Sequence, residues 1–324
     1  MLNIAGDIGG TKTHLALLDD KNPQQILKQK KYPSQNFASL EEIVLDFLKD
    51  ENSISTACFG IAGPIENGKC RATNLPWFID AEEMAKKLNT NKIFLINDLE
   101  ANAWGLGWLK DEELLILNEG RKDSIGNQAL IAAGTGLGEA GMYWDGNKHH
   151  PFPCEGGHCD FGPSDEEQIE LWRYLKGQYK HVSYERILSG PGLISLYKFL
   201  IHTGREKELE STKQAMLVDN PSKIITDKAL SKECKVCERA LNLFVYIYGE
   251  EAGNLALKLL CLGGLFIGGG IAPKIVSVMK EGLFMKGFLS KGRLAHVLSQ
   301  MPIKLILNEN TALLGASRYA TEKR

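Results

Sequence analysis

Two glycine-rich turns, each set between apolar runs, carry the clearest chemical signal in the sequence. The first is Gly6-Asp7-Ile8-Gly9-Gly10-Thr11, and the second is Gly134-Thr135-Gly136-Leu137-Gly138. Glycine lets the backbone turn sharply and brings N–H groups close to a phosphate. Thr11 and Thr135 add hydroxyl donors, and Asp7 offers a carboxylate beside which a hydrated Mg²⁺ could bind. One such turn alone is typical of a structural hairpin, but two facing each other would hold a nucleoside triphosphate.

A carboxylate and an amide follow the apolar run 92–96, at Asn97-Asp98. In α/β proteins a carboxylate at a strand end is well placed to act as a catalytic base. A second interpretation is that Asp98 caps a helix that begins at Leu99. The local pattern does not decide between base and cap.

A third cluster is Glu155-Gly156-Gly157-His158, where glycines between an acid and a histidine let both side chains turn toward one point. Glu185 is a further candidate acid. Carboxylates, an amide and a neutral imidazole suit a sugar, whose hydroxyls both donate and accept hydrogen bonds. Each residue alone is more typical of a surface ion pair or a core histidine, but together they indicate a polyol site.

Alternating strand and helix patterns position these residues. Strands are expected on both sides of each glycine turn, at 57–62, at 92–96, and at 265–267 before Gly268-Gly269-Gly270. Ser39 with Glu42 and Ser164 with Glu167 form capping boxes, and 236–260 reads as one long buried helix. The two strand–turn–strand units form a faint internal repeat, which favours duplicated α/β halves.

Composition excludes several classes of protein. The net charge of −2 provides no basic field for nucleic acid or a membrane surface, and 44% hydrophobic with 24% charged residues is ordinary for a globular enzyme. Seven scattered cysteines argue against a disulfide framework and for a reducing compartment. No secretory signal is expected, and the apolar stretch 255–272 contains Lys258 and a Gly-Gly break, so we interpret it as a buried helix end and a core strand.

Two weaker matches are set aside. The segment from Gly63 to Cys70 nearly spells a Walker A loop, but Cys70 stands where Ser or Thr should hold Mg²⁺. Cys234 and Cys237 have the spacing of half a zinc site, but no second pair or suitably spaced histidine accompanies them. We expect two unpaired thiols at the start of a helix.

Taken in order, these motifs resemble those of the bacterial glucokinases, members of the actin-like ATPases. The resemblance runs nearly from end to end and also includes Leu188-Ser189-Gly190-Pro191-Gly192. It implies a two-domain actin-like (ribonuclease H-like) α/β fold with a cleft between a small domain, 1–108 plus 304–324, and a large domain, 109–303. It implies transfer of phosphate from ATP, with Mg²⁺, to glucose, in a cytoplasmic homodimer.

The resemblance also implies a role for each candidate residue. Asp98 would be the general base on the glucose 6-hydroxyl, and Asp7 would lie near Mg²⁺ and contact it through water. The residues expected to bind glucose are Asn97, Asp98, Glu155, His158 and Glu185. Those expected to bind ATP are Gly6, Asp7, Gly9, Gly10, Thr11, Thr135, Gly136, Gly268 and Gly269.

The chain departs from the family pattern after Gly-Gly-Thr, where Lys12-Thr13-His14 replaces the common Asn-Ala-Arg. A lysine there resembles the wider group of repressor and kinase sugar proteins, although the zinc-binding cysteine cluster of that group is absent. The alternatives left open are a kinase for another hexose, such as mannose or an N-acetylated sugar, a sugar sensor without catalysis, and an actin-like ATPase that acts on a protein client.

Overall fold

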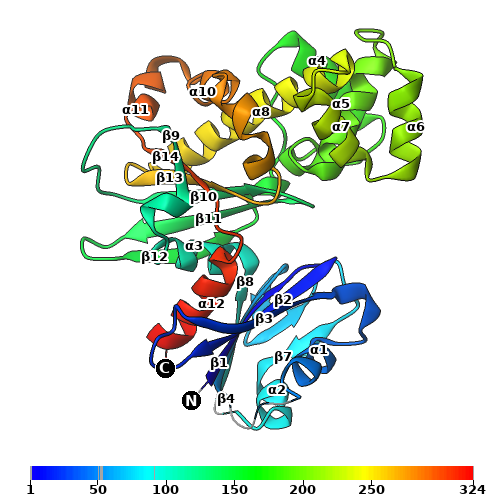
Figure 1. Ribbon diagram of the computed structural model, residues 1–324. Coiled ribbons are helices and arrows are strands. Elements are labelled where there is room, and N and C mark those ends of the chain that lie inside the picture. Colours follow the sequence, from blue (N-terminus) through cyan, green and yellow to red (C-terminus); the bar gives the residue numbers. More distant parts are fainter. Residues whose placement is uncertain (1, 50, 52–53, 91, 324) are drawn as a thin grey trace. The chain divides into compact units, whose positions relative to one another are not determined.

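The computed structural model describes residues 2–49, 51, 54–90 and 92–323. The chain divides into two compact units (Figure 1). Unit 1 comprises Met1–Leu114, Pro151–Pro153 and Asn308–Arg324, and unit 2 comprises Leu115–His150 and Cys154–Leu307. Each unit has its own sheet and its own buried core.

Unit 1 is built on a sheet with strand order β3-β2-β1-β4-β8. Strand β1 pairs antiparallel with β2 and parallel with β4, and β4 pairs parallel with β8. The central strands are almost wholly buried, whereas the edge strand β3 carries lysines that discourage pairing with another chain. The bounds are β1 Leu2–Ile8, β2 Lys12–Asp19, β3 Ile26–Pro33, β4 Ile54–Ile61 and β8 Lys92–Asn97.

Helices cover this sheet because each has an apolar face. In α1, residues 40, 43, 44 and 47 follow helical spacing and are buried, and Ser39 accepts the Glu42 amide as its sequence predicts. The last helix, α12, returns from the far end of the sequence to pack on α3, β1 and β4 (Figure 1). The bounds are α1 Leu40–Phe47, α2 Ala81–Lys87, α3 Asp98–Leu106 and α12 Thr311–Glu322, with a small sheet of β5 Ile65–Glu66, β6 Lys69–Arg71 and β7 Phe78–Asp80.

Unit 2 contains a sheet with strand order β12-β11-β10-β13-β14-β9. Strand β10 pairs antiparallel with β11 and parallel with β13, so it repeats the relation of β1 to β2 and β4. This confirms the internal repeat inferred from the glycine turns. The bounds are β9 Leu114–Asn118, β10 Gln128–Ala133, β11 Leu137–Trp144, β12 His149–Cys154, β13 Gly264–Gly268 and β14 Ile303–Ile306.

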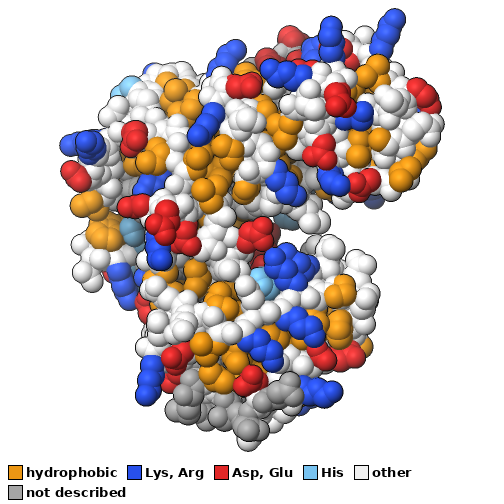
Figure 2. Space-filling model, in the orientation of Figure 1, with side chains coloured by type: hydrophobic (Ala, Val, Ile, Leu, Met, Phe, Trp, Pro, Cys, Tyr) orange, Lys and Arg blue, Asp and Glu red, His pale blue; other side chains and the backbone are white. Residues whose placement is uncertain are grey.

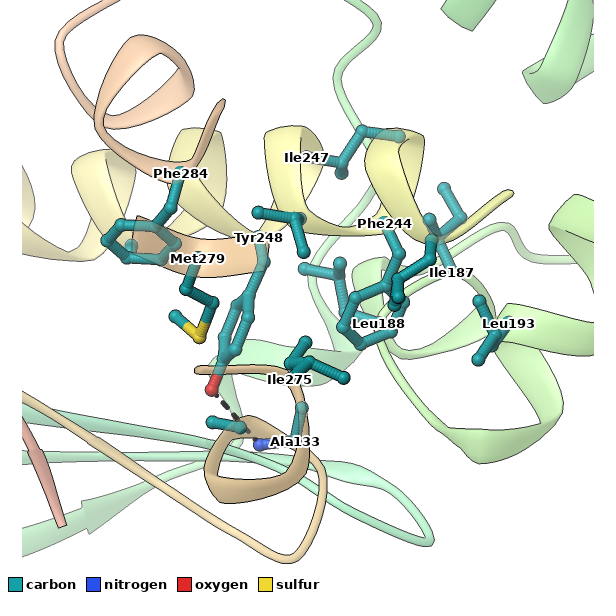
Figure 3. Close-up of a cluster of buried hydrophobic side chains, with 14 of the residues drawn as sticks. Ala133, Ile187, Leu188, Leu193, Phe244, Ile247, Tyr248, Ile275, Met279 and Phe284 are labelled. Carbon is teal, nitrogen blue, oxygen red and sulfur yellow. Dashed lines mark hydrogen bonds between the residues drawn. The ribbon is translucent and has the colours of Figure 1, made fainter. Parts of the chain in front are cut away.

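The core of unit 2 is organised by α8, the long buried helix that its sequence predicts (Figure 3). Its side chains pack against the sheet and against several other helices. The helix bounds are α4 Glu166–Lys176, α5 Gly190–His202, α6 Glu210–Val218, α7 Pro221–Leu230, α8 Lys235–Leu259, α9 Val276–Lys280, α10 Leu283–Phe288 and α11 Ala295–Ser299.

One predicted cap is wrong by one residue. Helix α4 is capped by Asp165, whose Oδ1 accepts the Gln168 amide at 2.8 Å, rather than by Ser164. The Ser164 hydroxyl instead donates to Glu250 Oε1 at 2.5 Å. A buried carboxylate from another helix therefore competes successfully for this hydroxyl, which local sequence could not indicate.

The two weaker motifs have structural explanations. The Walker-like segment forms the hairpin β5–β6, with Asn67 and Gly68 at positive φ in its turn. Cys234 and Cys237 are buried free thiols at the start of α8, as expected. Within the described ranges, no helix has both the length and the apolar character to cross a membrane.

Charged side chains of both signs are interspersed over the face shown in Figure 2. Two lysines of β3 are paired with acids: Lys30 Nζ lies 2.9 Å from Asp46, and Lys31 Nζ lies 3.2 Å from Glu309. The lysines of this edge strand are thus partly neutralised within unit 1.

Candidate active site

Hydrogen bonds from Ser34 fix the first glycine turn, which lies in unit 1. The turn joins β1 to β2, and the Gly9 N–H donates to the Lys12 carbonyl at 3.0 Å. The buried Ser34 donates its hydroxyl to the Gly9 carbonyl at 2.8 Å and its N–H to the Thr11 carbonyl at 3.1 Å. Because two carbonyls of the turn are occupied in this way, the turn is fixed while the Thr11 side chain remains exposed.

Asp7 lies at the end of β1, opposite His14 of β2. Burial raises the pKa of the Asp7 carboxyl, and the nearby Lys12 ammonium opposes that rise. Among the described residues, no group of three or more His, Cys, Asp or Glu could hold a metal ion. A lone carboxylate still suits Mg²⁺, which keeps most of its waters and takes its other ligands from substrate phosphates.

Gly6 plays a different part from the one predicted for the turn. It lies inside β1, fully enclosed, and a Cβ there would come within 2.5 Å of the Phe59 ring. Its lack of a side chain therefore serves close packing in the sheet.

Asn97 and Asp98 stand where β8 ends and α3 begins. Asn97 is the N-cap, and its Oδ1 accepts the amides of Leu99 at 2.9 Å and Glu100 at 3.3 Å. Asp98 is the first helical residue, with Oδ1 2.9 Å from the Leu99 amide. The helix cap is thus Asn97, and the positive end of α3 favours a negative charge on Asp98.

Helix α3 lies close to the sheet because β4 has a glycine beneath it. A Cβ on Gly60 would come within 2.8 Å of the Ala101 Cβ and 3.5 Å of the Asp98 Cα. Gly60 therefore sets how deeply the start of α3, and with it Asp98, sits against the sheet.

The second glycine turn, in unit 2, joins β10 to β11 and is supported on several sides. The Gly134 N–H donates to the Gly136 carbonyl at 2.8 Å, and the Gly190 N–H donates to the Gly134 carbonyl at 2.9 Å. Glu185 Oε2 accepts the Leu137 amide at 3.0 Å. Glu185, expected to bind sugar, is thus already bonded to the turn expected to bind phosphate.

Gly268 is the last residue of β13, and Gly269 follows it beside the same turn. Gly269 has φ +83°, a conformation that side chains disfavour, and the Ile271 N–H two residues later donates to the Ala133 carbonyl at 3.2 Å. This loop therefore runs against the start of the second glycine turn.

Glu155 directly precedes a short 3-10 helix, Gly156–His158, of which His158 is the last residue, and both side chains are exposed. Neither intervening glycine has positive φ. Instead, a Cβ on Gly156 would meet the Glu139 carboxylate, and one on Gly157 would meet the Leu137 carbonyl. Close approach to β11, rather than freedom of rotation, explains these glycines.

The structure thus brings Glu185, Thr135 and Gly136 into one cluster with the loops of Gly269 and Glu155 in unit 2. In unit 1 the first glycine turn and Asn97-Asp98 lie at the ends of β1 and β8, in the same sheet. Each unit therefore presents its expected residues at strand ends or in adjoining loops.

Three supporting residues were not singled out from the sequence. Ser34 holds the first turn, and Tyr248 hydrogen bonds to the end of β10 (Figure 3). Glu139 lies beneath the Glu155 loop, and the only signal for it was one acid within the otherwise uncharged strand 137–144.

Comparisons with known proteins point to the same family over nearly the whole length of the chain. Residues 4–323 match the family model described as Glucokinase. A glucokinase from Nostoc sp. is 40% identical over 339 residues, covering 98% of each chain. A solved glucokinase from an Antarctic psychrotroph is 31% identical with a TM-score of 0.82, covering 99% of both chains. A ROK family glucokinase from Streptomyces griseus, solved with glucose and AMPPNP, has a TM-score of 0.68 at 19% identity, covers 99% of this chain and 100% of its own, and shows likeness of fold alone.

Proposed function

This chain belongs to the glucokinase family, and we propose that it transfers the γ-phosphoryl group of ATP to the 6-hydroxyl of glucose. One observation carries the proposal: in each unit a glycine turn joins two antiparallel strands, β1–β2 in unit 1 and β10–β11 in unit 2. A side chain from elsewhere in the same unit hydrogen bonds to each turn, Ser34 to the first and Glu185 to the second. The finer arrangement in this proposal is that of an actin-like ATPase, with substrates meeting in a cleft between a small and a large domain.

Asp98 is the general base in this proposal. It follows β8 directly and sits at the N-terminus of α3, where the helix favours its charged form. A base in that form can take the proton from the attacking hydroxyl, a contribution of about 10²–10⁴ in rate. Asn97, with its carbonyl oxygen engaged in capping, would use its amide NH₂ to donate to a sugar oxygen.

Glu155, His158 and Glu185 would bind the remaining hydroxyls. Two are exposed and one is half-buried, and all lie on segments fixed to β11 or to the second glycine turn. Carboxylates accept from hydroxyls, and a neutral imidazole both donates and accepts. This set recognises a ring of hydroxyls rather than a charged substrate.

The turns would bind the phosphates through backbone N–H groups and the Thr11 and Thr135 hydroxyls. Asp7 would hold Mg²⁺ through water, and the ion would neutralise charge on the phosphate oxygens. Gly268 and Gly269 would lie against the adenosine. We also propose that the protein works as a cytoplasmic homodimer, as the family resemblance implies.

The test is a coupled assay of ADP release across glucose, mannose and N-acetylated hexoses, with Asp98→Asn as the diagnostic variant. We expect glucose to give the highest kcat/KM. Asp98→Asn should bind glucose with normal affinity and lose turnover by about 10²–10⁴.

Glu100→Gln is the matched control, because Glu100 is an acid in the same first helical turn that hydrogen bonds to Trp104. It should keep turnover close to that of the wild type. Near-normal turnover in Asp98→Asn would reject the base, a different preferred hexose would revise the substrate, and sugar binding without ADP release would indicate a sensor.

A further inference from the structure

Two buried glutamates beneath the expected sugar-binding segments are not accounted for by the mechanism. Glu139 on β11 is 1% exposed and Glu251 on α8 is 0% exposed. In each, Oε1 is buried and has no hydrogen-bond partner among the described residues when both carboxyls are ionised. Two buried like charges side by side would be strongly unfavourable, and the Lys258 ammonium, 3.7 Å from Glu251 Oε1, offsets them only in part.

A single added proton removes this problem. The two side chains lie within hydrogen-bonding reach of each other, so a protonated carboxyl of one can donate to the other. Burial, together with the neighbouring Glu251 charge, raises the pKa of Glu139 well above its usual range. Burial likewise raises the pKa of Glu251. Two carboxyls that share one proton are the stable form of such a pair.

Glu139 lies against one of the expected sugar-binding segments, and Glu251 is linked to the other through Asn254. The Glu139 carboxylate lies against Gly156, between Glu155 and His158. Glu251 Oε2 accepts Asn254 Nδ2 at 2.8 Å, and the same Nδ2 donates to the Tyr184 hydroxyl at 2.9 Å. Tyr184 immediately precedes Glu185.

We propose that Glu139 and Glu251 share one proton, and that this pair is a positioning device that holds the segments of Glu155, His158 and Glu185 in their sugar-binding arrangement. The inference rests on the proposed glucose kinase function. Loss of the shared proton would place two repelling charges under Gly156 and beside Tyr184, and it would displace both segments at once.

Several other groups face the pair and could titrate. Lys258 Nζ lies 3.7 Å from Glu251 Oε1 and partly offsets its charge. The others interact with the pair electrostatically from neighbouring elements: Tyr184, Tyr248, Cys154 and Lys291. Burial raises the pKa of each of the two tyrosines and of Cys154, so these groups stay neutral where the pair first ionises.

The experiment measures the glucose dissociation constant by calorimetry, without ATP, from about pH 6.5 to about pH 9.5. For the wild type we expect weakening by about three-fold or more across the alkaline half of this range, with uptake of part of a proton on binding. In Glu139→Gln the side chain stays neutral, so the glucose dissociation constant should change by less than about two-fold over this pH range, and binding should take up no proton. In turnover, the KM for glucose should follow the same pattern, and the KM for ATP should not.

Glu250→Gln is the matched control. Glu250 is the adjacent buried acid on α8, but it bonds to Ser164 and to Gln168 rather than to the sugar segments. This variant should keep the wild-type dependence of the glucose dissociation constant on pH. If Glu139→Gln fails to fold, Glu251→Gln replaces it and should show the same pH-independent glucose binding.

A wild-type profile that is already flat, or a Glu139→Gln profile as steep as the wild type, would overturn the proposal. Proton uptake is measured on the unaltered protein, so its absence near pH 8 would also overturn it even if both variants were unstable. Failure of the kinase proposal is separate, since it would appear as no glucose-dependent ADP release in the coupled assay, whatever the pH profile of glucose binding.

Discussion

Removing the hydroxyl of Tyr248 should lower the thermal stability of unit 2 and raise the KM for ATP. Tyr248 is 0% exposed, and its hydroxyl donates to the Ile131 carbonyl at 3.3 Å. The same hydroxyl accepts the Ala133 amide, also at 3.3 Å (Figure 3). Ala133 is the last residue of β10 before the second glycine turn. Tyr248→Phe keeps the ring among Phe244 and Phe284 and deletes these two bonds alone.

The expected cost falls mainly on the Ala133 amide, because a carbonyl has a second lone pair with which to find another donor. Leaving a buried donor without its partner costs about 1–3 kcal/mol. For a unit of this size, about 2 kcal/mol lowers Tm by roughly 4–8 °C. Differential scanning calorimetry measures this shift, and initial rates should show a raised KM for ATP with little change in the KM for glucose.

Tyr197→Phe is the control for this substitution. Tyr197 is equally buried at 1% exposure, but its hydroxyl contacts Glu208 at 3.4 Å and no part of the glycine turn. It should lower Tm without raising the KM for ATP. If Tyr248→Phe changed neither quantity, the two hydrogen bonds of the Tyr248 hydroxyl would not support the turn.

Three further expectations follow from named contacts. Gly156→Ala should raise the KM for glucose at least several-fold because its methyl group would meet the Glu139 carboxylate, whereas Gly177→Ala, whose nearest new contact is 3.4 Å away, should leave kinetics unchanged. Asn97→Ala removes the cap of α3 and should cost about 0.5–2 kcal/mol in urea unfolding, with unchanged stability arguing against the cap. Burial raises the pKa of Glu139 to about 8, so the folded state binds the extra proton and stability should fall as pH rises from about 4.5 to about 8; Glu139→Gln should remove that slope from the Tm profile.

The local sequence was sufficient to predict the elements that carry the site. Apolar runs bounded by glycine predicted the strands on either side of both turns, and helical spacing predicted α8 almost to its ends. The internal repeat followed because both hairpins use the same strand–glycine–strand pattern. Order of motifs along the chain, together with the family resemblance, was enough to indicate the glucokinase family, which the family model confirms.

Local sequence was less informative where one residue had two possible partners. At the start of α3 the sequence suggested Asp98 as a possible cap, whereas the structure caps this helix with Asn97, whose side chain accepts the Leu99 and Glu100 amides. The start of α4 was mispredicted because Glu250, distant along the chain, engages Ser164. Hydrogen bonds between distant segments depend on how the elements pack, and no local window contains that information.

The sequence by itself determined which segments are strands, helices and turns, and which of them carry chemically active side chains, because these properties depend on spacing and on residue type over a few positions. The tertiary structure decided why Gly6, Gly60 and Gly156 must be glycine, and it placed Ser34 and Tyr248 beneath the two turns. It also buried Glu139 and Glu251, which are far apart in the chain, close to each other. Burial and close approach are properties of the packed chain, so only folding creates them.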